Sequence, residues 1–240
     1  MTKYKGHHYG DLESMKFDYR RESYYKGLET IKSLGYEFED LIHHFPAFVG
    51  HMGLSRFLGL YELYKKTLGV AGHIGEVGVY KGASLLFLTK LVQIFEYENL
   101  TQVHGFDWFK GNEPGELETK IEKHGYAESY ERIMKLIEAQ QIQNIVKVHK
   151  MDVTSELKPF LEQYLHLQFK LVFLDAGLYD VVKTVLPFLW ERITPGGILI
   201  LDQFNHELSP GETMAIRELL PDREVKTIPN IWMPSAYIVK

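Results

Sequence analysis

The sequence predicts an α/β fold with a Rossmann-like, seven-stranded and mostly parallel sheet. From Gly72 onward, short apolar runs alternate with segments of helical periodicity, which is the pattern of repeated βα units. The runs L-V-F-L (residues 171–174) and I-L-I-L (residues 198–201) are continuously apolar. Such runs are typical of strands that are buried on both faces, as in parallel sheets.

Residues 1–69 are predicted to form an N-terminal arm and a helical cap. Residues 1–20 are polar, and residues 22–68 have helical spacing with breaks at Gly35 and Pro46. No linker rich in Pro, Gly or Ser separates this region from residues 70–240. We therefore interpret it as a cap on the edge of the sheet rather than as a separate domain.

The elements of the sheet region are expected in regular order. Strands are expected to end near residues 76, 106, 151, 174 and 201, and helices are expected at 83–95, 126–140, 155–166, 178–192 and 212–220. Pro187 is expected to kink or interrupt its helix. The T-P-G-G segment, residues 194–197, is predicted to be a turn. Two terminal strands, at 224–228 and 236–240, would complete the sheet.

Composition excludes several classes of protein. The chain has 240 residues, of which 45% are hydrophobic and 25% charged, as in an ordinary globular protein. Its formal net charge of -5 argues against a nucleic-acid partner. With no cysteine, it has no disulfide, zinc-thiolate site or thiol nucleophile. No signal peptide or membrane-spanning segment is expected, so a cytoplasmic location is the default expectation.

The turn after the first strand has the spacing E-x-G-x-x-x-G, formed by Glu76, Gly78 and Gly82. This differs from the G-x-G-x-x-G spacing of dinucleotide-binding turns, which direct amides at a pyrophosphate. An acidic residue in the turn suits a ligand that carries positive charge or offers hydroxyl and amino donors, such as S-adenosylmethionine (SAM). The alternative is that the glycines serve only positive φ angles and close packing.

Acidic residues recur where successive predicted strands end. They are Glu76, Asp107, Asp152, Asp175 and Asp202. In open α/β sheets, ligands bind outside the carboxyl ends of the strands. Turn and helix-cap preferences explain any one of these residues, but they explain the whole set less well. The set therefore indicates a ligand site at this edge.

The chain resembles the class I SAM-dependent methyltransferases, and among them the small-molecule and sugar O-methyltransferases related to macrocin O-methyltransferase. The resemblance covers roughly residues 70–240. It depends on E-V-G-V-Y-K-G-A-S (76–84), G-F-D-W-F-K-G (105–111), L-D-A-G-L-Y-D (174–180), T-P-G-G-I-L-I-L-D-Q-F (194–204) and P-G-E-T-M-A (210–215). Each segment is weak evidence alone, but the ordered set is strong.

The resemblance implies a set of cofactor contacts. Glu76, Gly78 and Gly82, with Ser84 nearby, would form the turn under the methionine moiety. Asp107 would accept hydrogen bonds from the two ribose hydroxyls, as the acidic residue of nicotinamide-binding folds does.

The adenine contacts are implied by the same resemblance. Trp108 would offer a stacking face for adenine, although an aromatic side chain there can also be simple packing. Asp152 would accept from the adenine amino group, and the Val153 amide would donate to a ring nitrogen. Asp175 would lie between cofactor and acceptor.

Some relatives hold Mg²⁺ with an acid after strand four and an acidic pair after strand five. Asp175 and Asp202 match two of these positions, but the third residue is Gln203, which can ligate through its carbonyl oxygen without adding charge. Metal dependence therefore stays open. His206 is the candidate general base, because its ordinary pKa suits proton uptake near neutrality. It can equally be a loop histidine at the rim of the site.

The other histidines give weaker evidence for a functional role. The pairs His7-His8 and His43-His44 have a structural or solvent-facing interpretation, because adjacent helical positions point in different directions. His51 and Arg56 could reach the acceptor from the cap, an idea that depends only on their position in the chain.

The expected reaction is methyl transfer from SAM to a hydroxyl of a small molecule, most of all a sugar in a glycoconjugate or natural product. A catechol- or phenol-type O-methyltransferase is the nearest alternative. A SAM-binding regulatory protein without transfer activity is another. No nucleic-acid or membrane partner is expected, and a homodimer is the usual arrangement for such a domain.

Overall fold

The computed structural model describes residues 21–231 and 233–240. The chain divides into two compact units, Met1–Leu54 and Ser55–Lys240. This division lies inside helix α3 (His51–Lys66), so the C-terminal part of α3 belongs to the second unit. The boundary after residue 69 stays a prediction, and His7 and His8 lie outside the described residues.

The first unit contains α1 (Arg21–Ser33), α2 (Phe38–His43) and the 3₁₀ helix η2 (Phe45–Ala47). Gly35, with φ of +69°, follows the end of α1, as expected of a helix stop. Pro46 lies in the first turn of η2, where a missing N–H removes no helical hydrogen bond. His43 and His44 are exposed.

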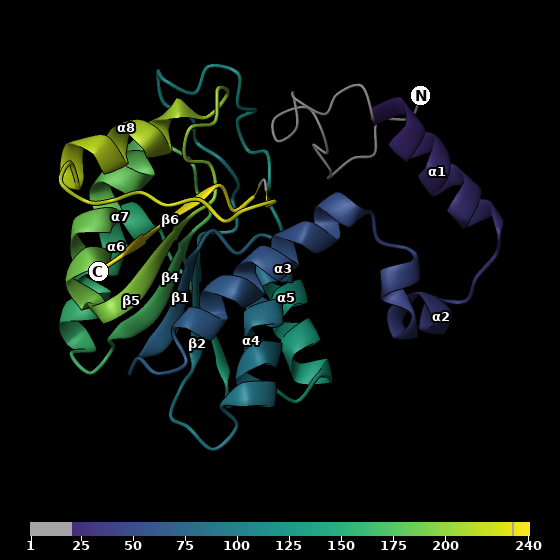
Figure 1. Ribbon diagram of the computed structural model, residues 1–240, viewed down its shortest axis with the longest axis horizontal. Coiled ribbons are helices and arrows are strands. Elements are labelled where there is room, and N and C mark those ends of the chain that lie inside the picture. The colour runs from purple at the N-terminus through teal and green to yellow at the C-terminus, as the bar shows by residue number, and fades with distance from the viewer. Residues whose placement is uncertain (1–20, 232) are drawn as a thin grey trace. The chain divides into compact units, whose positions relative to one another are not determined.

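The second unit is built on one sheet with the strand order β3-β2-β1-β4-β5-β6 (Figure 1). The strands are β1 (His73–Val77), β2 (Val103–Asp107), β3 (Val146–Lys150), β4 (Phe169–Leu174), β5 (Ile193–Leu201) and β6 (Ala236–Val239). The first five are parallel, and β6 pairs antiparallel with β5. The predicted mostly parallel α/β sheet is therefore confirmed.

Two details of the prediction need correction. The described residues form six strands rather than seven, because residues 224–228 contribute only an isolated bridge between Lys226 and Tyr237. Pro229 follows closely and has no N–H for a longer ladder. The T-P-G-G segment is part of β5 rather than a turn. There Gly196 has φ of +84°, and the pairing of β4 with β5 shifts register, as at a β-bulge.

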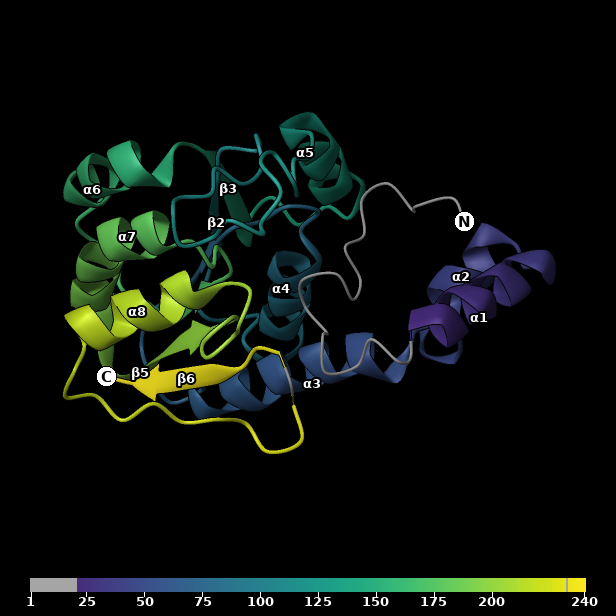
Figure 2. The same cartoon turned by 90° about the horizontal axis from the view of Figure 1, so that it is seen from above.

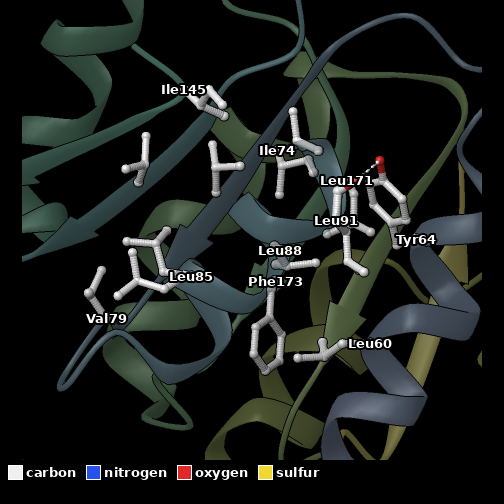
Figure 3. Close-up of a cluster of buried hydrophobic side chains, with 14 of the residues drawn as sticks. Leu60, Tyr64, Ile74, Val79, Leu85, Leu88, Leu91, Ile145, Leu171 and Phe173 are labelled. Atoms are coloured by element: carbon white, nitrogen blue, oxygen red, sulfur yellow. Dashed lines mark hydrogen bonds between the residues drawn. The ribbon is translucent and has the colours of Figure 1, made fainter. Parts of the chain in front are cut away.

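Helices cover both faces of the sheet (Figures 1 and 2). The C-terminal part of α3 packs on one face with α4 (Ala83–Phe95) and α5 (Tyr130–Ala139), whereas α6 (Val153–Gln163), α7 (Tyr179–Arg192) and α8 (Pro210–Leu219) pack on the other. Successive strand residues point to opposite faces. Each face therefore has its own apolar cluster. Leu171 and Phe173 belong to the cluster on the α3, α4 and α5 side, drawn in Figure 3, and Val172 and Leu174 belong to the cluster on the α6, α7 and α8 side. The continuous apolar runs supply both cores.

A buried ion pair fixes α3 against the sheet. Lys170 of β4 is fully buried, and its Nζ lies 2.5 Å from both carboxylate oxygens of Glu96, directly after α4. The Tyr64 hydroxyl of α3 donates to the same carboxylate at 2.6 Å. Tyr64 also belongs to the apolar cluster drawn in Figure 3. The helix is thus anchored by polar contacts and by packing.

Histidines of three neighbouring strands form a row on the α6 side of the sheet. Nδ1 of His104 lies 3.1 Å from Nε2 of His149, and their rings are stacked. His73 contacts the His104 ring edge-on. Burial lowers the pKa of His104 to about 3 and that of His149 to about 4. These rings are therefore neutral at neutral pH and serve as part of the packing.

Among the described residues, no helix combines the length and the apolar character needed to cross a membrane.

Candidate active site

The predicted acidic residues all lie at the carboxyl edge of the parallel strands. Glu76 is the last residue but one of β1, and Asp107 ends β2. Asp175 and Asp202 directly follow β4 and β5, and Asp152 caps α6 after β3. Because parallel strands share one direction, these carboxylates meet at one edge, where open α/β sheets bind ligands.

The glycine turn has strict backbone requirements. Gly78 has φ of +92°, and a Cβ there would lie 2.3 Å from the carbonyl oxygen of Asp175. Gly82 has φ of +77° and forms the left-handed N-cap of α4. The turn after β1 therefore packs directly against the end of β4, and this contact keeps Glu76 and Asp175 near each other.

Glu76 is the buried acid of this turn. Its Oε1 accepts a hydrogen bond from Ser84 Oγ at 2.7 Å, whereas its Oε2 is buried without a hydrogen-bond partner among the described residues. Burial raises the pKa of Glu76 to about 8, and the charges of Asp107 and Asp202 add to this rise. A buried carboxyl oxygen without a partner is costly, and a donor from a bound ligand would remove this cost. The ammonium group of SAM fits this requirement.

Asp107 holds the turn together. Its Oδ2 accepts from the backbone amides of Val79 and Tyr80, at 2.8 and 2.9 Å, and its Oδ1 accepts from Phe109 N at 2.6 Å. A carboxylate oxygen has two lone pairs, so Oδ1 keeps capacity for a further donor. In this structure Asp107 links the end of β2 to the turn after β1. Its contact with ribose stays a prediction.

The predicted adenine residues have structural roles of their own. Trp108 Nε1 donates to the Gly111 carbonyl at 2.8 Å. Asp152 is the N-cap of α6, and its Oδ1 accepts from the Thr154 amide at 3.0 Å and from the Thr154 hydroxyl at 2.6 Å. Val153 begins α6, where the helix provides no acceptor for its amide. Their contact with adenine stays a prediction.

Arg56 joins the two aspartates that follow β4 and β5. Its Nη2 lies 2.6 Å from Asp175 Oδ2, and its Nη1 lies 2.5 Å from Asp202 Oδ1. Its guanidinium also stands 5.2 Å from the centre of the Phe173 ring. In the sequence, Arg56 lies four residues before Leu60, on the helical stripe that continues with buried Leu63 and Tyr64. A charged residue on an apolar stripe is the sequence signal for such a partly buried ion pair.

The residues predicted to hold Mg²⁺ do not fit a divalent ion in this arrangement. Arg56 contacts both Asp175 and Asp202. The side-chain oxygen of Gln203, the third predicted ligand, lies 2.9 Å from Ser209 Oγ. Among the residues that the structure describes, no three His, Cys, Asp or Glu side chains are grouped as a metal site would require.

Asp175 and Asp202 differ in accessibility. The Asp175 side chain is 24% exposed, whereas that of Asp202 is 1% exposed. Burial and the neighbouring charge of Asp202 raise the pKa of Asp175, and the guanidinium of Arg56 opposes this rise. Asp175 is thus the carboxylate of this pair that an acceptor can contact.

His206 is poorly arranged for the predicted role of general base. Its Nδ1 accepts from the Leu208 amide at 3.3 Å, so the neutral ring carries its proton on Nε2. The free nitrogen is then a donor rather than a proton acceptor. Burial also lowers the pKa of His206, which weakens it as a base.

Glu212 is a site neighbour that the sequence interpretation gave no role. It is fully buried in the first turn of α8, and its Oε1 accepts from the Gln203 amide at 2.9 Å. Its Oε2 is buried and without a hydrogen-bond partner in the described part of the chain. Burial, with the charge of Asp202, raises the pKa of Glu212 well above its ordinary range. It was missed because an acidic residue in a first helical turn is common.

A mostly parallel α/β sheet, an E-x-G-x-x-x-G turn and acids at the carboxyl ends of the strands define the class I SAM-dependent methyltransferases. Residues 76–204 match a family model that is described as a methyltransferase domain. The match spans more than half of the 240 residues, so the chain belongs to this methyltransferase family. No curated protein sequence matches the chain.

Solved structures share the fold. A crystal structure of the calicheamicin methyltransferase CalS11 is 22% identical, with a TM-score of 0.81 over 89% of this chain and 91% of that chain. An apo structure of CalS11, a TDP-rhamnose 3'-O-methyltransferase of calicheamicin biosynthesis, is 23% identical, with a TM-score of 0.74 over 89% and 93%. The O-methyltransferase NovP is 17% identical, with a TM-score of 0.63 over 78% and 79%.

Proposed function

We propose that this methyltransferase transfers the methyl group of SAM to a hydroxyl of a small molecule, and that the acceptor is a sugar in a glycoconjugate or natural product. The observation that carries the proposal is the partly exposed carboxylate of Asp175 beside the cofactor turn, at the carboxyl edge of β4. The fold shared with CalS11 and NovP, both described as O-methyltransferases, supports it.

The cofactor would be held mainly by β1 and β2. Glu76 would accept the ammonium group, and the free capacity of Asp107 Oδ1 would serve a ribose hydroxyl. Gly78 allows close approach, because no side chain stands between the turn and the end of β4. When bound, SAM supplies a methyl group on a positively charged sulfur.

The acceptor would be activated by a carboxylate. A sugar hydroxyl is a poor nucleophile, so a base near the reacting oxygen assists it, and alignment supplies much of the remaining rate enhancement. Asp175 is accessible, whereas Asp202 is buried behind the guanidinium of Arg56. We therefore assign proton acceptance to Asp175. His206 would line the site without acting as the base.

The test is a methyl-transfer assay with isotopically labelled SAM and a panel of hydroxyl acceptors. TDP-rhamnose represents the sugar acceptors, since CalS11 is described as acting on it, and catechol represents the phenolic ones. We expect transfer to a sugar acceptor, lost in Asp175→Asn and kept in the control Asp222→Asn, which changes an exposed aspartate. Transfer to catechol alone would establish the phenol-type alternative. SAM binding without transfer to any hydroxyl would favour the regulatory alternative.

A further inference from the structure

We propose that Arg56 is the permanent cation of the acceptor site and that methyl transfer in this protein proceeds without a divalent metal. The inference rests on the proposed function, because it assigns a part of the same site. Its geometric basis is the bridge that one guanidinium makes between Asp175 and Asp202.

The position of Arg56 matches the position that a metal ion would need. Each of its terminal nitrogens contacts one aspartate, at 2.6 and 2.5 Å, so the guanidinium stands between the two predicted ligands. The planar fork of arginine suits two carboxylates at once, unlike the compact ammonium of lysine. A metal that used the same oxygens would have to break both ion pairs.

Charge favours the same conclusion. Leu174 and Leu201 are register partners in adjacent strands, so the aspartates that follow them are neighbours and repel each other. Two carboxylates and one guanidinium leave one net negative charge. Three acidic ligands and a divalent ion would leave the same charge. With Gln203 in the third position, the site lacks the third negative charge, so it would hold a divalent ion less strongly than three acidic ligands would.

The guanidinium is held by rigid elements. The ring of Phe173, in β4, lies under the guanidinium. Helix α3, which carries Arg56, is fixed two turns later by the hydrogen bond from Tyr64 to Glu96. The Gln203 oxygen faces Ser209 rather than the aspartates. The arrangement therefore resists the rearrangement that metal binding would demand.

Arg56 acts through its neighbours. A guanidinium cannot accept a proton near neutral pH, so Arg56 is a positioning residue. It contacts Oδ2 of Asp175, and the Asp175 carboxylate rather than Arg56 takes the proton of the acceptor hydroxyl. Its loss would allow the two aspartates to separate.

Mn²⁺ binding, followed by electron paramagnetic resonance, tests the proposal without any acceptor. Wild-type protein is expected to show no stoichiometric Mn²⁺ site. Arg56→Ala should gain one, and adding Gln203→Glu should tighten it about tenfold or more. Arg132→Ala is the matched control, since it removes an arginine whose side chain is 78% exposed. Stoichiometric Mn²⁺ binding by the wild type, as tight as in Arg56→Ala, would overturn the proposal.

Turnover gives a second readout. With an acceptor from the transfer assay, EDTA should leave kcat of the wild type unchanged, Arg56→Ala should lower it about 100-fold, and Arg56→Lys should recover part of the loss. Loss of wild-type turnover in EDTA, restored by Mg²⁺, would contradict the proposal. If Arg56→Ala fails to fold by circular dichroism, the wild-type Mn²⁺ and EDTA results still decide. Absence of SAM binding would defeat the proposed function but leave the Mn²⁺ result interpretable.

Discussion

Glu76→Gln is expected to stabilise the protein near pH 7 while weakening its affinity for SAM. Burial raises the pKa of Glu76 from an ordinary 4.5 to about 8. Between these pH values, the folded protein keeps a proton that the unfolded chain has released. The contribution of Glu76 to stability is therefore full below pH 4.5 and falls as the pH rises toward 8.

The magnitude follows from the pKa. At pH 7, about 2.5 pH units above the ordinary value, keeping Glu76 protonated in the folded protein lowers the free energy of unfolding by ~3.4 kcal/mol, at 1.36 kcal/mol per unit. Glutamine does not ionise and can still accept from Ser84, so the variant should be about 1–3 kcal/mol more stable at pH 7. At pH 5 the difference should shrink below about 1 kcal/mol. Glutamine cannot ionise to pair with the ammonium group of SAM as Glu76 would on binding, and losing this charge-assisted hydrogen bond should weaken SAM binding by about 10- to 150-fold.

Urea unfolding at pH 5 and pH 7 measures the first effect, and calorimetric titration with SAM at pH 7 measures the second. Glu116→Gln is the control, because it neutralises an exposed glutamate and should change neither result. The reasoning is refuted if Glu76→Gln is less stable than the wild type at pH 7, or if it binds SAM as tightly.

Three further predictions concern other parts of the structure. Asp107→Ala is expected to abolish SAM binding in calorimetry, because three backbone amides lose their acceptor. Asp202→Ala should keep SAM binding and lose turnover. Equal SAM binding by both variants would disprove the cofactor placement. Acidification from pH 6.5 to 4.5 is expected to cost the wild type about 4–5 kcal/mol more unfolding free energy than a variant with His104 and His149 both replaced by phenylalanine, since both rings stay largely neutral in the folded protein and the unfolded chain binds two protons. Urea unfolding of both proteins at both pH values checks this; equal pH dependence of the two proteins would contradict it. Lys170→Met is expected to cost about 3–5 kcal/mol in urea unfolding, because it leaves a buried carboxylate unpaired; wild-type stability would show that the ion pair contributes nothing.

The features that local sequence determines were predictable. Continuous apolar runs indicated a parallel sheet, and Gly78 and Gly82 marked the turn whose positive φ angles the structure contains. The placement of acids at strand ends followed from parallel pairing, because every strand then ends at the same edge. Such inferences need no knowledge of distant contacts.

The features that depend on distant contacts were not predictable in the same way. Arg56 lies 119 residues before Asp175 and 146 before Asp202, so its bridge depends on how α3 packs against β4. The seventh strand was expected from residue type, but pairing at Lys226 does not extend beyond one bridge. Side chains that link separate elements become visible only when those elements are placed.

The most direct test of the account is a calorimetric titration with SAM, performed once in EDTA and once with Mg²⁺. We predict the same affinity in both, with Kd on the order of micromolar, because the proposed cofactor contacts lie on β1 and β2 and the proposed cation of the site is Arg56. Binding only with Mg²⁺ would show that the site depends on a metal. Absence of binding in both would contradict the assignment of the cofactor itself.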